Sequence, residues 1–290
     1  MNEVVIIGGG PAGVSAALYT TRAGISTKII YKDNGALETA EKIDNFYGSP
    51  GVSGRGLVIS GLAHAKEMGA DIINSEVVKI EHQFDGDGNF VIETTDSRHT
   101  PQALLLATGA SRAMPKIPGL LEYESKGVSQ CAICDAFFYK GKDVAVLGHG
   151  EYALSEVKVL LPLVKSVTVL TNGKEPEASF PADVIVCKEI VKEILGETRL
   201  SGVALEPAEE IVQISGLFIA IGTAGATALA RKIGALTEDN AVIVDNNMQT
   251  NIPGLWAAGD CTAGMKQIAK AVYDGAKAGT DIVKYMRENS

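Results

Sequence analysis

Two closely spaced cysteines mark the stretch of this sequence that is best suited to chemistry. Cys131 and Cys134 are separated by two residues, and residues i and i+3 share one face of a helical turn, so the pair can close a reversible disulfide. If a helix begins near Cys131, its unpaired N–H groups and its dipole favour the thiolate, which is the nucleophile in disulfide exchange. Asp135 follows directly and is a candidate proton donor or acceptor.

A zinc site is the alternative use of this motif, because a CxxC pair also forms half of a four-cysteine site. The other two cysteines, Cys187 and Cys261, are isolated in the sequence, with no second CxxC or pair of histidines nearby. We therefore favour a redox role for Cys131 and Cys134 and predict no metal site.

The composition is typical of a soluble globular protein with two domains. The chain has 290 residues, of which 46% are hydrophobic and 21% are charged, enough for two cores of ordinary size. No apolar run approaches the roughly 20 residues that cross a bilayer. We therefore expect no membrane contact and a cytoplasmic protein, and in that compartment a CxxC is more often catalytic than structural. The net charge of -9 argues against nucleic acid as a partner.

The elements that must position the cysteines begin with a glycine-rich turn. An apolar run over Val4–Ile7 predicts a buried parallel strand, and Val14–Arg22 has the composition of a helix. Between them lies a GxGxxG motif in which Gly8 makes the turn, Gly10 lets the backbone approach a pyrophosphate, and Gly13 allows the helix to pack on the strand. This context predicts a dinucleotide site at the helix N-terminus.

A second strand over Thr27–Tyr31 should end beside the ribose of that dinucleotide. Asp33 is the acidic residue at this point and is a candidate ribose ligand, although it comes slightly late in the sequence. The alternative interpretation of Asp33 is an ordinary turn residue.

A second glycine turn repeats the pattern in the middle of the chain. The predicted strand Asp143–Leu147 runs into Gly148–Ala153 and a helix. The chain therefore carries two dinucleotide-type units, and we predict an α/β fold of two Rossmann-like, doubly wound domains. We place the borders of the central domain at the stiff segment Pro115–Gly119 and near Asn246.

Four stretches together resemble the low-molecular-weight thioredoxin reductases, which are FAD proteins. They are GGGPAG from residue 8, ATGA from residue 107, CAICDAFFYKGKDVAVLG from residue 131 and TNIPGLWAAGD from residue 250, and they span nearly the whole chain in family order. The resemblance implies an FAD-binding domain made of residues 1–114 and 246–290. It also implies a central, NAD(P)H-domain-like domain of residues 115–245 that carries the disulfide, with thioredoxin as the electron acceptor.

The resemblance also implies roles for individual residues. Cys134 is expected to meet the flavin ring, Cys131 to attack the protein substrate, and Asp135 to handle the proton. The residues expected to bind FAD are Gly8, Gly10, Pro11, Ala12, Gly13, Tyr31, Asp33, Asn45, Val78, Thr108, Gly109, Gly259, Asp260, Lys266, Gln267 and Ile268.

Some of these FAD contacts have more specific expectations. Asn45 and Thr108 should lie near the flavin and its chain, and Asp260 near the ribityl-phosphate region. Lys266 and Gln267 stand where the family usually has Arg-Gln. Ala136 replaces a usual glycine, which we regard as a minor change.

The second nucleotide unit departs from the NADPH-using relatives. They carry an arginine-rich stretch just after its second strand, where guanidinium groups match the 2′-phosphate. This sequence has Leu170–Glu175 there and no arginine between Arg112 and Arg199. Glu151 would point a carboxylate toward the pyrophosphate, at a cost of about 1 kcal/mol in water and about 4 kcal/mol at an effective dielectric near 20 for charges about 4 Å apart. Alternatively, Glu151 caps the helix and NADH still binds.

If nicotinamide is excluded, another donor must reduce the flavin. FAD can take up single electrons and pass them on as a pair, and a ferredoxin near about -400 mV can reduce a thioredoxin near about -270 mV with about 6 kcal/mol to spare. The sequence resembles the ferredoxin-dependent flavin thioredoxin reductases, which lack the NADPH motifs. We therefore expect ferredoxin as donor. The basic residues offered as docking candidates are Lys28, Lys32, Lys42 and Arg55.

The sequence is also compatible with three other functions. They are an NAD(P)H-dependent thioredoxin reductase with unusual cofactor contacts, a flavin dithiol oxidase that uses oxygen, and a flavin redox sensor without turnover. Family analogy also leads us to expect a homodimer.

Overall fold

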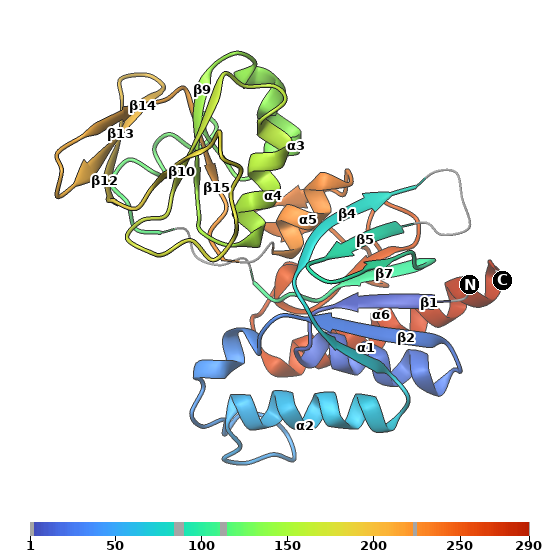
Figure 1. The fold of residues 1–290 in the computed structure, drawn as a ribbon. Helices are drawn as coiled ribbons and strands as arrows, with labels where there is room; N and C mark the ends of the chain where they lie inside the picture. The colour runs from blue at the N-terminus through green and yellow to red at the C-terminus, as the bar shows by residue number, and fades with distance from the viewer. Residues whose placement is uncertain (1–2, 84–89, 111–114, 223–224, 290) are drawn as a thin grey trace. The chain divides into compact units, whose positions relative to one another are not determined.

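Two compact units make up the chain. The structure is a computed structural model, and it describes residues 3–83, 90–110, 115–222 and 225–289. Met1–Ser111 and Gly225–Ser290 form the first unit, and Arg112–Ala224 form the second (Figure 1). Each unit contains a parallel sheet, so the predicted α/β fold of two Rossmann-like units is confirmed.

A five-stranded parallel sheet is the core of the first unit. The strands Leu255–Ala257, Ala103–Leu106 and Glu3–Ile7 are buried apolar runs apart from Glu3, as expected for strands covered on both faces, whereas Asp71–Asn74 at the edge of the sheet is partly exposed. In spatial order they are β18 (Leu255–Ala257), β7 (Ala103–Leu106), β1 (Glu3–Ile7), β2 (Ser26–Tyr31) and β3 (Asp71–Asn74).

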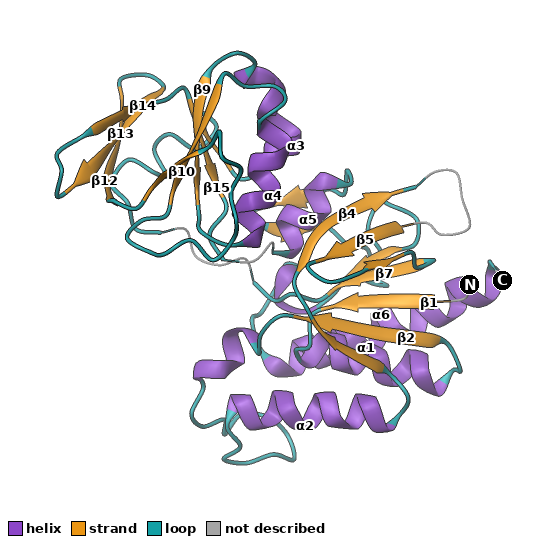
Figure 2. Cartoon of the chain, in the orientation of Figure 1, coloured by secondary structure: helices purple, strands orange, loops and turns teal. Residues whose placement is uncertain are grey.

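Two helices from opposite ends of the first unit pack closely together. α1 (Pro11–Arg22) lies against α6 (Ile268–Glu288), with β1 and β2 next to them (Figure 2). A Cβ on Gly275 would come within 2.1 Å of the Ala12 carbonyl oxygen, so only glycine permits this approach. Ser53 is the N-cap residue of α2 (Gly54–Glu67). Its side chain accepts a hydrogen bond from the Gly56 N–H at 3.1 Å, as expected of an N-cap serine.

Smaller elements complete the first unit. An antiparallel sheet contains β4 (Val77–His82), β5 (Phe90–Thr94) and β6 (Arg98–His99), and the helix α5 (Ala226–Lys232) contacts β4. The remaining elements are β16 (Thr237–Glu238), β17 (Ala241–Val242) and the short helices η1 (Gly35–Thr39) and η3 (Gly259–Cys261).

The second unit repeats the parallel architecture. In spatial order its sheet contains β11 (Ile185–Cys187), β10 (Ser166–Leu170), β9 (Asp143–Leu147), β15 (Gly216–Ile219) and β8 (Val128–Ser129). Its helices are α3 (Ala132–Asp135), η2 (Ala136–Tyr139) and α4 (Glu151–Leu160). An antiparallel sheet of β12 (Ile190–Gly196), β13 (Leu200–Glu206) and β14 (Ile211–Gln213) follows.

The border after the central unit falls earlier in the chain than the position near Asn246 expected from the sequence. Residues 225–245 group with the first unit. The Ala226 N–H at the start of α5 donates to the Thr108 hydroxyl at 2.7 Å, which ties this segment to the end of β7. The other predicted border, between 114 and 115, lies at the edge of residues 111–114, which are outside the described part of the chain.

No helix in the described ranges combines the length and the apolar character that a membrane span requires.

Candidate functional site

A disulfide joins Cys131 to Cys134, with the two Cα atoms 5.4 Å apart. Cys131 is the N-cap residue of α3 and is only 4% exposed, whereas Cys134 is exposed one turn later. The accessible cysteine in this arrangement is therefore Cys134.

Asp135 is connected to the disulfide through a serine. The Ser129 hydroxyl donates to the Asp135 carboxylate at 2.6 Å and accepts from the Cys131 N–H at 3.1 Å. Burial raises the pKa of Tyr139 on the next turn, and the negative charge of Asp135 adds to this effect. The sequence analysis did not single out Ser129. Its position two residues before the first cysteine was the available signal.

A second carboxylate reaches the same turn from α4. Glu156 is 1% exposed, and its Oε2 accepts a hydrogen bond from the Ala132 N–H at 2.8 Å. The sequence analysis missed this residue. The signal was an acidic residue within the otherwise apolar buried face of α4, beside Tyr152, Ala153 and Val157.

The predicted FAD residues of the first unit gather at one edge of its parallel sheet. The strand ends are followed by predicted site residues in four places: Gly8 after β1, Asp33 after β2, Thr108 after β7 and Gly259 after β18. Because the carboxyl ends of parallel strands meet at one edge, this edge is where an open α/β sheet binds its ligand.

The first glycine turn leaves room where a pyrophosphate needs it. A Cβ on Gly8 would lie 2.2 Å from the Ala107 carbonyl oxygen, and one on Gly13 would lie 2.0 Å from the Gly8 carbonyl oxygen. At Gly10, in contrast, no described atom beyond its chain neighbours lies within 4 Å of such a Cβ. Pro11 then begins α1 and Ala12 is buried, so an open cradle faces a helix N-terminus.

Three further residues that were expected to bind FAD have different surroundings. Tyr31 packs against the turn, with its Cβ 3.2 Å from a Cβ on Gly9. The Asp33 carboxylate accepts from the Gly35 N–H at 2.9 Å, as in an Asx turn. Val78 lies at an irregularity of β4, where the register with β5 shifts.

Residues far apart in the sequence meet at the start of α6. The Asn45 side-chain amide donates to the Gln267 side chain at 2.9 Å, and Ile268 is the first residue of the helix. Thr108 uses its hydroxyl oxygen to cap α5, and Gly109 follows with a φ of +76°, a value that favours glycine.

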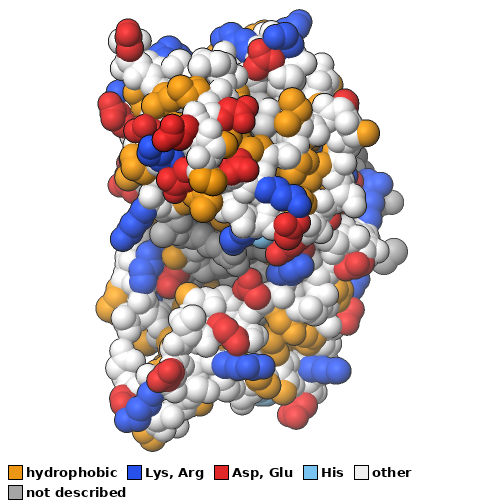
Figure 3. Space-filling model, turned by 60° about the vertical axis from the view of Figure 1, so that its left-hand side comes forward, with side chains coloured by type: hydrophobic (Ala, Val, Ile, Leu, Met, Phe, Trp, Pro, Cys, Tyr) orange, Lys and Arg blue, Asp and Glu red, His pale blue; other side chains and the backbone are white. Residues whose placement is uncertain are grey.

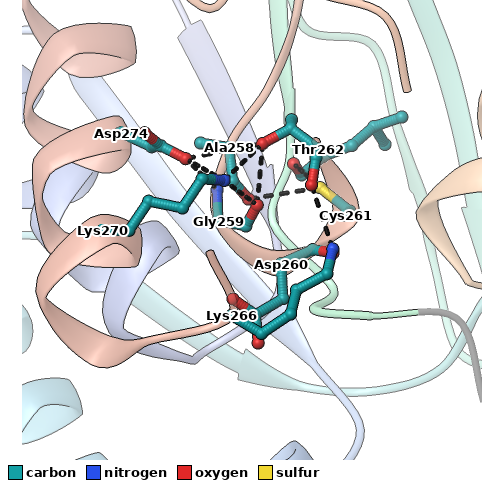
Figure 4. A network of polar contacts seen from close by, with 9 residues as sticks. Ala258, Gly259, Asp260, Cys261, Thr262, Lys266, Lys270 and Asp274 are labelled. Carbon is teal, nitrogen blue, oxygen red and sulfur yellow. Dashed lines mark hydrogen bonds and ion pairs between the residues drawn. The ribbon is translucent and has the colours of Figure 1, made fainter. Parts of the chain in front are cut away.

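The Gly259–Asp260 turn is held by two lysines of the tail (Figure 4). Lys270 donates to the Gly259 carbonyl at 2.9 Å and pairs with the buried Asp274 carboxylate at 2.7 Å. Lys266 donates to the backbone carbonyl of Asp260. Lys270 and Asp274 were not predicted as site residues. Their opposite charges and their spacing of four residues within a helix would have indicated an ion pair.

Asp260 carries a buried polar atom that fits an absent ligand. Its Oδ1 has no hydrogen-bond partner among the described residues. Burial raises the pKa of the Asp260 carboxyl group, and the nearby Lys266 and Lys270 oppose the rise. Together with the open cradle at Gly10, this atom fits a polar group of a bound FAD.

The second glycine turn resembles the first in backbone packing but not in its opening. A Cβ on Gly148 would lie 2.1 Å from the Ala220 carbonyl oxygen, as in a tight strand-to-helix turn. At Gly150, however, a carboxylate oxygen of Glu177 lies 3.5 Å from the Cβ position. The Glu177 N–H donates to the His149 carbonyl at 2.8 Å, so the backbone holds this residue at the turn.

The loop after β10 is organised without arginine. The Asn172 side chain accepts from the Val191 N–H at 2.8 Å, and Lys188 pairs with Glu175 at 2.6 Å. Glu151 is the first residue of α4. The first residue of this helix is therefore acidic, and a second carboxylate, that of Glu177 in the loop after β10, lies beside its N-cap residue Gly150.

The described ranges contain no group of three or more His, Cys, Asp or Glu side chains that could hold a metal ion. The two free cysteines differ in accessibility. Cys261 is buried, which raises the pKa of its thiol to about 12, and Cys187 is partly exposed.

Comparison with known proteins gives a consistent result. Residues 2–275 match the family described as pyridine nucleotide-disulphide oxidoreductase. A thioredoxin reductase of Aquifex aeolicus (strain VF5) is 31% identical over 302 residues, which cover 98% of this chain and 93% of that protein.

Solved structures extend the likeness to three dimensions. The atypical thioredoxin reductase TRi from Desulfovibrio vulgaris Hildenborough matches with a TM-score of 0.91 and 37% identity over 99% of both chains. A ferredoxin-flavin thioredoxin reductase from Clostridium acetobutylicum matches with a TM-score of 0.72 and 29% identity, covering 99% of this chain and 98% of that one.

The two Rossmann-type units, the open glycine cradle and the disulfide define a flavin-dependent disulfide oxidoreductase. The chain belongs to the low-molecular-weight thioredoxin reductase family within the pyridine nucleotide-disulphide oxidoreductases. FAD is the cofactor of this family, and when bound it supplies the electrons that reduce the disulfide.

Proposed function

We propose that this thioredoxin reductase receives electrons from reduced ferredoxin through FAD and passes them through Cys131 and Cys134 to thioredoxin, without using NADPH or NADH. The observation that carries the proposal is the Glu177 carboxylate beside Gly150. A dinucleotide places its pyrophosphate at such a turn, where this chain has negative charge.

NADH and NADPH differ in how much binding affinity they should lose at this turn. Glu177 is 73% exposed, so the figure for water applies, and each carboxylate about 4 Å from a phosphate costs about 1 kcal/mol. Glu151 and Glu177 together would weaken either coenzyme about 30-fold. For NADPH, each missing arginine contact to the 2′-phosphate forgoes a further contribution of about 1.5–3 kcal/mol.

The names of two structural relatives agree with an unusual donor. The relative with 37% identity is called an atypical thioredoxin reductase, and another is called a ferredoxin-flavin thioredoxin reductase. These names support the proposal for this chain because both matches extend over 99% of it.

The residue roles follow from the family resemblance. Cys134 meets the flavin ring and Cys131 attacks the thioredoxin disulfide. Asp135, connected to the Cys131 N–H through Ser129, handles the proton. The protein acts as a homodimer in the cytoplasm.

The docking surface for ferredoxin is not assigned to the four basic residues considered from the sequence. Each of them pairs with a carboxylate: Lys28 with Glu3, Lys32 with Glu76, Lys42 with Asp44 and Arg55 with Glu38. Acidic and basic side chains are intermixed on the face shown in Figure 3. The donor proposal therefore depends on the nucleotide turn rather than on a basic patch.

Anaerobic steady-state turnover tests the proposal. The purified FAD-loaded protein is mixed with oxidised thioredoxin and one donor at a time, and thioredoxin thiols are counted. Ferredoxin kept reduced should support turnover, and NADPH and NADH should not. Efficient turnover with NADPH or NADH would contradict the proposal. A dithiol oxidase would instead oxidise a small dithiol in air and reduce oxygen to peroxide, and it would reduce little thioredoxin.

A further inference from the structure

A buried acidic residue outside the CxxC motif contacts the redox turn. Glu156 lies on α4, and Figure 1 shows this helix within the second unit, which also carries the disulfide. Its carboxylate accepts the Ala132 N–H at 2.8 Å, and Ala132 directly follows Cys131. A glutamate side chain that is 1% exposed is uncommon in proteins unless it is paired, and the Ala132 N–H is one of its partners here.

Both backbone N–H groups at the first cysteine are bound to protein acceptors. The Cys131 N–H donates to the Ser129 hydroxyl, which in turn donates to Asp135, and the Ala132 N–H donates to Glu156. At the start of a helical turn, such N–H groups are the ones that stabilise a cysteine thiolate. Here the Cys131 N–H is linked to the Asp135 carboxylate through the Ser129 hydroxyl, and the Ala132 N–H binds the Glu156 carboxylate directly.

We infer that Glu156 is a positioning residue of the redox centre that directs the proton of the reduced pair to Cys131 and leaves the negative charge on Cys134. Two electrons from reduced FAD break the S–S bond. The two sulfurs then share one proton taken up from solvent, giving one thiol and one thiolate. A carboxylate beside Cys131 disfavours a thiolate there, because like charges oppose each other. The inference depends on the redox role of the disulfide and not on the identity of the electron donor.

The same contact favours the disulfide over the dithiol. Because the reduced pair carries the negative charge and the disulfide is neutral, a nearby carboxylate lowers the midpoint potential and makes the dithiol a stronger reductant. Other charged or titratable groups near this turn are Asp135 and Tyr139, Arg199 and Lys142 near Tyr139, and Glu124, which accepts from the Gln130 side chain at 2.9 Å. Tyr152, also on α4, places its hydroxyl 3.5 Å from the Gln130 carbonyl oxygen.

Glu156→Gln isolates the charge because glutamine keeps an oxygen that accepts the Ala132 N–H. The protein is reduced with a small dithiol, and alkylation of each cysteine is followed by mass spectrometry from pH 5 to 10. At pH 6 we expect Cys131 to be alkylated about tenfold faster in E156Q than in the unchanged protein. The reason is that removing a neighbouring carboxylate should lower the pKa of the Cys131 thiol by about one unit. The midpoint potential should rise by about 30 mV, which is the same factor of ten for a two-electron couple.

Ser155→Ala is the matched control. Ser155 neighbours Glu156 on α4, and its hydroxyl donates to the Tyr152 carbonyl at 2.8 Å, so its loss should leave both measurements unchanged. If E156Q has the potential and the alkylation profile of the unchanged protein, the inference is overturned.

The unchanged protein provides a test that does not depend on folding of the variant. The pH midpoint of alkylation should be higher for Cys131 than for Cys134, and midpoints, unlike rates, are independent of accessibility. Equal or reversed midpoints would overturn the inference. Neither experiment uses ferredoxin, nicotinamide or thioredoxin, so the result is separate from the fate of the proposed donor.

Discussion

The Glu177 Oε2 atom lies 3.5 Å from the position that a Cβ would take on Gly150, whereas the corresponding position on Gly10 is open among the described residues. Both glycines precede the first residue of a helix, α4 and α1 respectively. One chain therefore contains two similar turns, and among the described residues only the second has a carboxylate beside the glycine that precedes the helix.

Neutralising the second turn should restore some nucleotide affinity. In the double variant Glu151→Gln, Glu177→Gln, we expect NADH to bind about 30-fold more tightly than in the unchanged protein, because two repulsions of about 1 kcal/mol each are removed. Isothermal titration of the FAD-loaded protein measures this. Glu175→Gln is the control, since that carboxylate pairs with Lys188, and it should change affinity little. Tight NADH binding before any substitution would contradict the argument.

The cysteine roles predict different spectra for two single variants. In Cys131→Ser, which has no disulfide, the remaining Cys134 thiolate should lie against the oxidised flavin and give a long-wavelength charge-transfer band. Cys134→Ser should give no such band. Absorption spectra of the two FAD-loaded variants with the flavin oxidised, recorded as the pH is raised to ionise the remaining thiol, make the comparison. A band in Cys134→Ser alone would mean that the roles are reversed.

The Lys270–Asp274 pair should be important for stability and FAD retention. Lys270→Met leaves the buried Asp274 carboxylate without its cation, and breaking a buried ion pair costs about 3–5 kcal/mol. We expect a loss of about that size in the free energy of unfolding by urea, together with weaker FAD binding. Lys284→Met is the control on the same helix, because Lys284 and Glu288 are exposed and 4.0 Å apart and such pairs contribute about 0–1 kcal/mol. Equal losses in both variants would refute the assignment.

Asp260 predicts a pH dependence in the FAD-free protein. Burial raises the pKa of its carboxyl group above the ordinary value of 3.8, so the folded state holds this proton more tightly than the unfolded state. The corresponding stability is present below pH 3.8 and is lost as pH rises through the folded-state pKa. Asp260→Asn should therefore lose less stability between about pH 4 and pH 7, measured by urea unfolding. A steeper loss in the variant would contradict this sign.

Local motifs in the sequence were sufficient to predict the two Rossmann-type units and the disulfide. GxGxxG at Gly8–Gly13 and the pair Cys131 and Cys134 are short, and their chemistry depends on neighbours in sequence. The strands predicted before the two glycine turns, Val4–Ile7 and Asp143–Leu147, correspond to β1 and β9.

Contacts between distant segments were not predictable in the same way. Glu156 reaches Ala132 across 24 residues, and Thr108 caps α5 at Ala226 across 118 residues. The second contact joins the start of α5 to the end of β7 within the first unit, with which residues 225–245 group. Such pairings depend on how helices and loops pack, and neither composition nor periodicity encodes them.

The reductive half-reaction tests the central claim most directly. The oxidised, FAD-loaded protein is mixed without oxygen with reduced ferredoxin, NADPH or NADH in a stopped-flow instrument, and the flavin absorbance is followed without thioredoxin. We predict rapid bleaching by reduced ferredoxin and no bleaching by either nicotinamide on the same timescale. Rapid bleaching by NADPH or NADH, or no bleaching by reduced ferredoxin, would contradict the account.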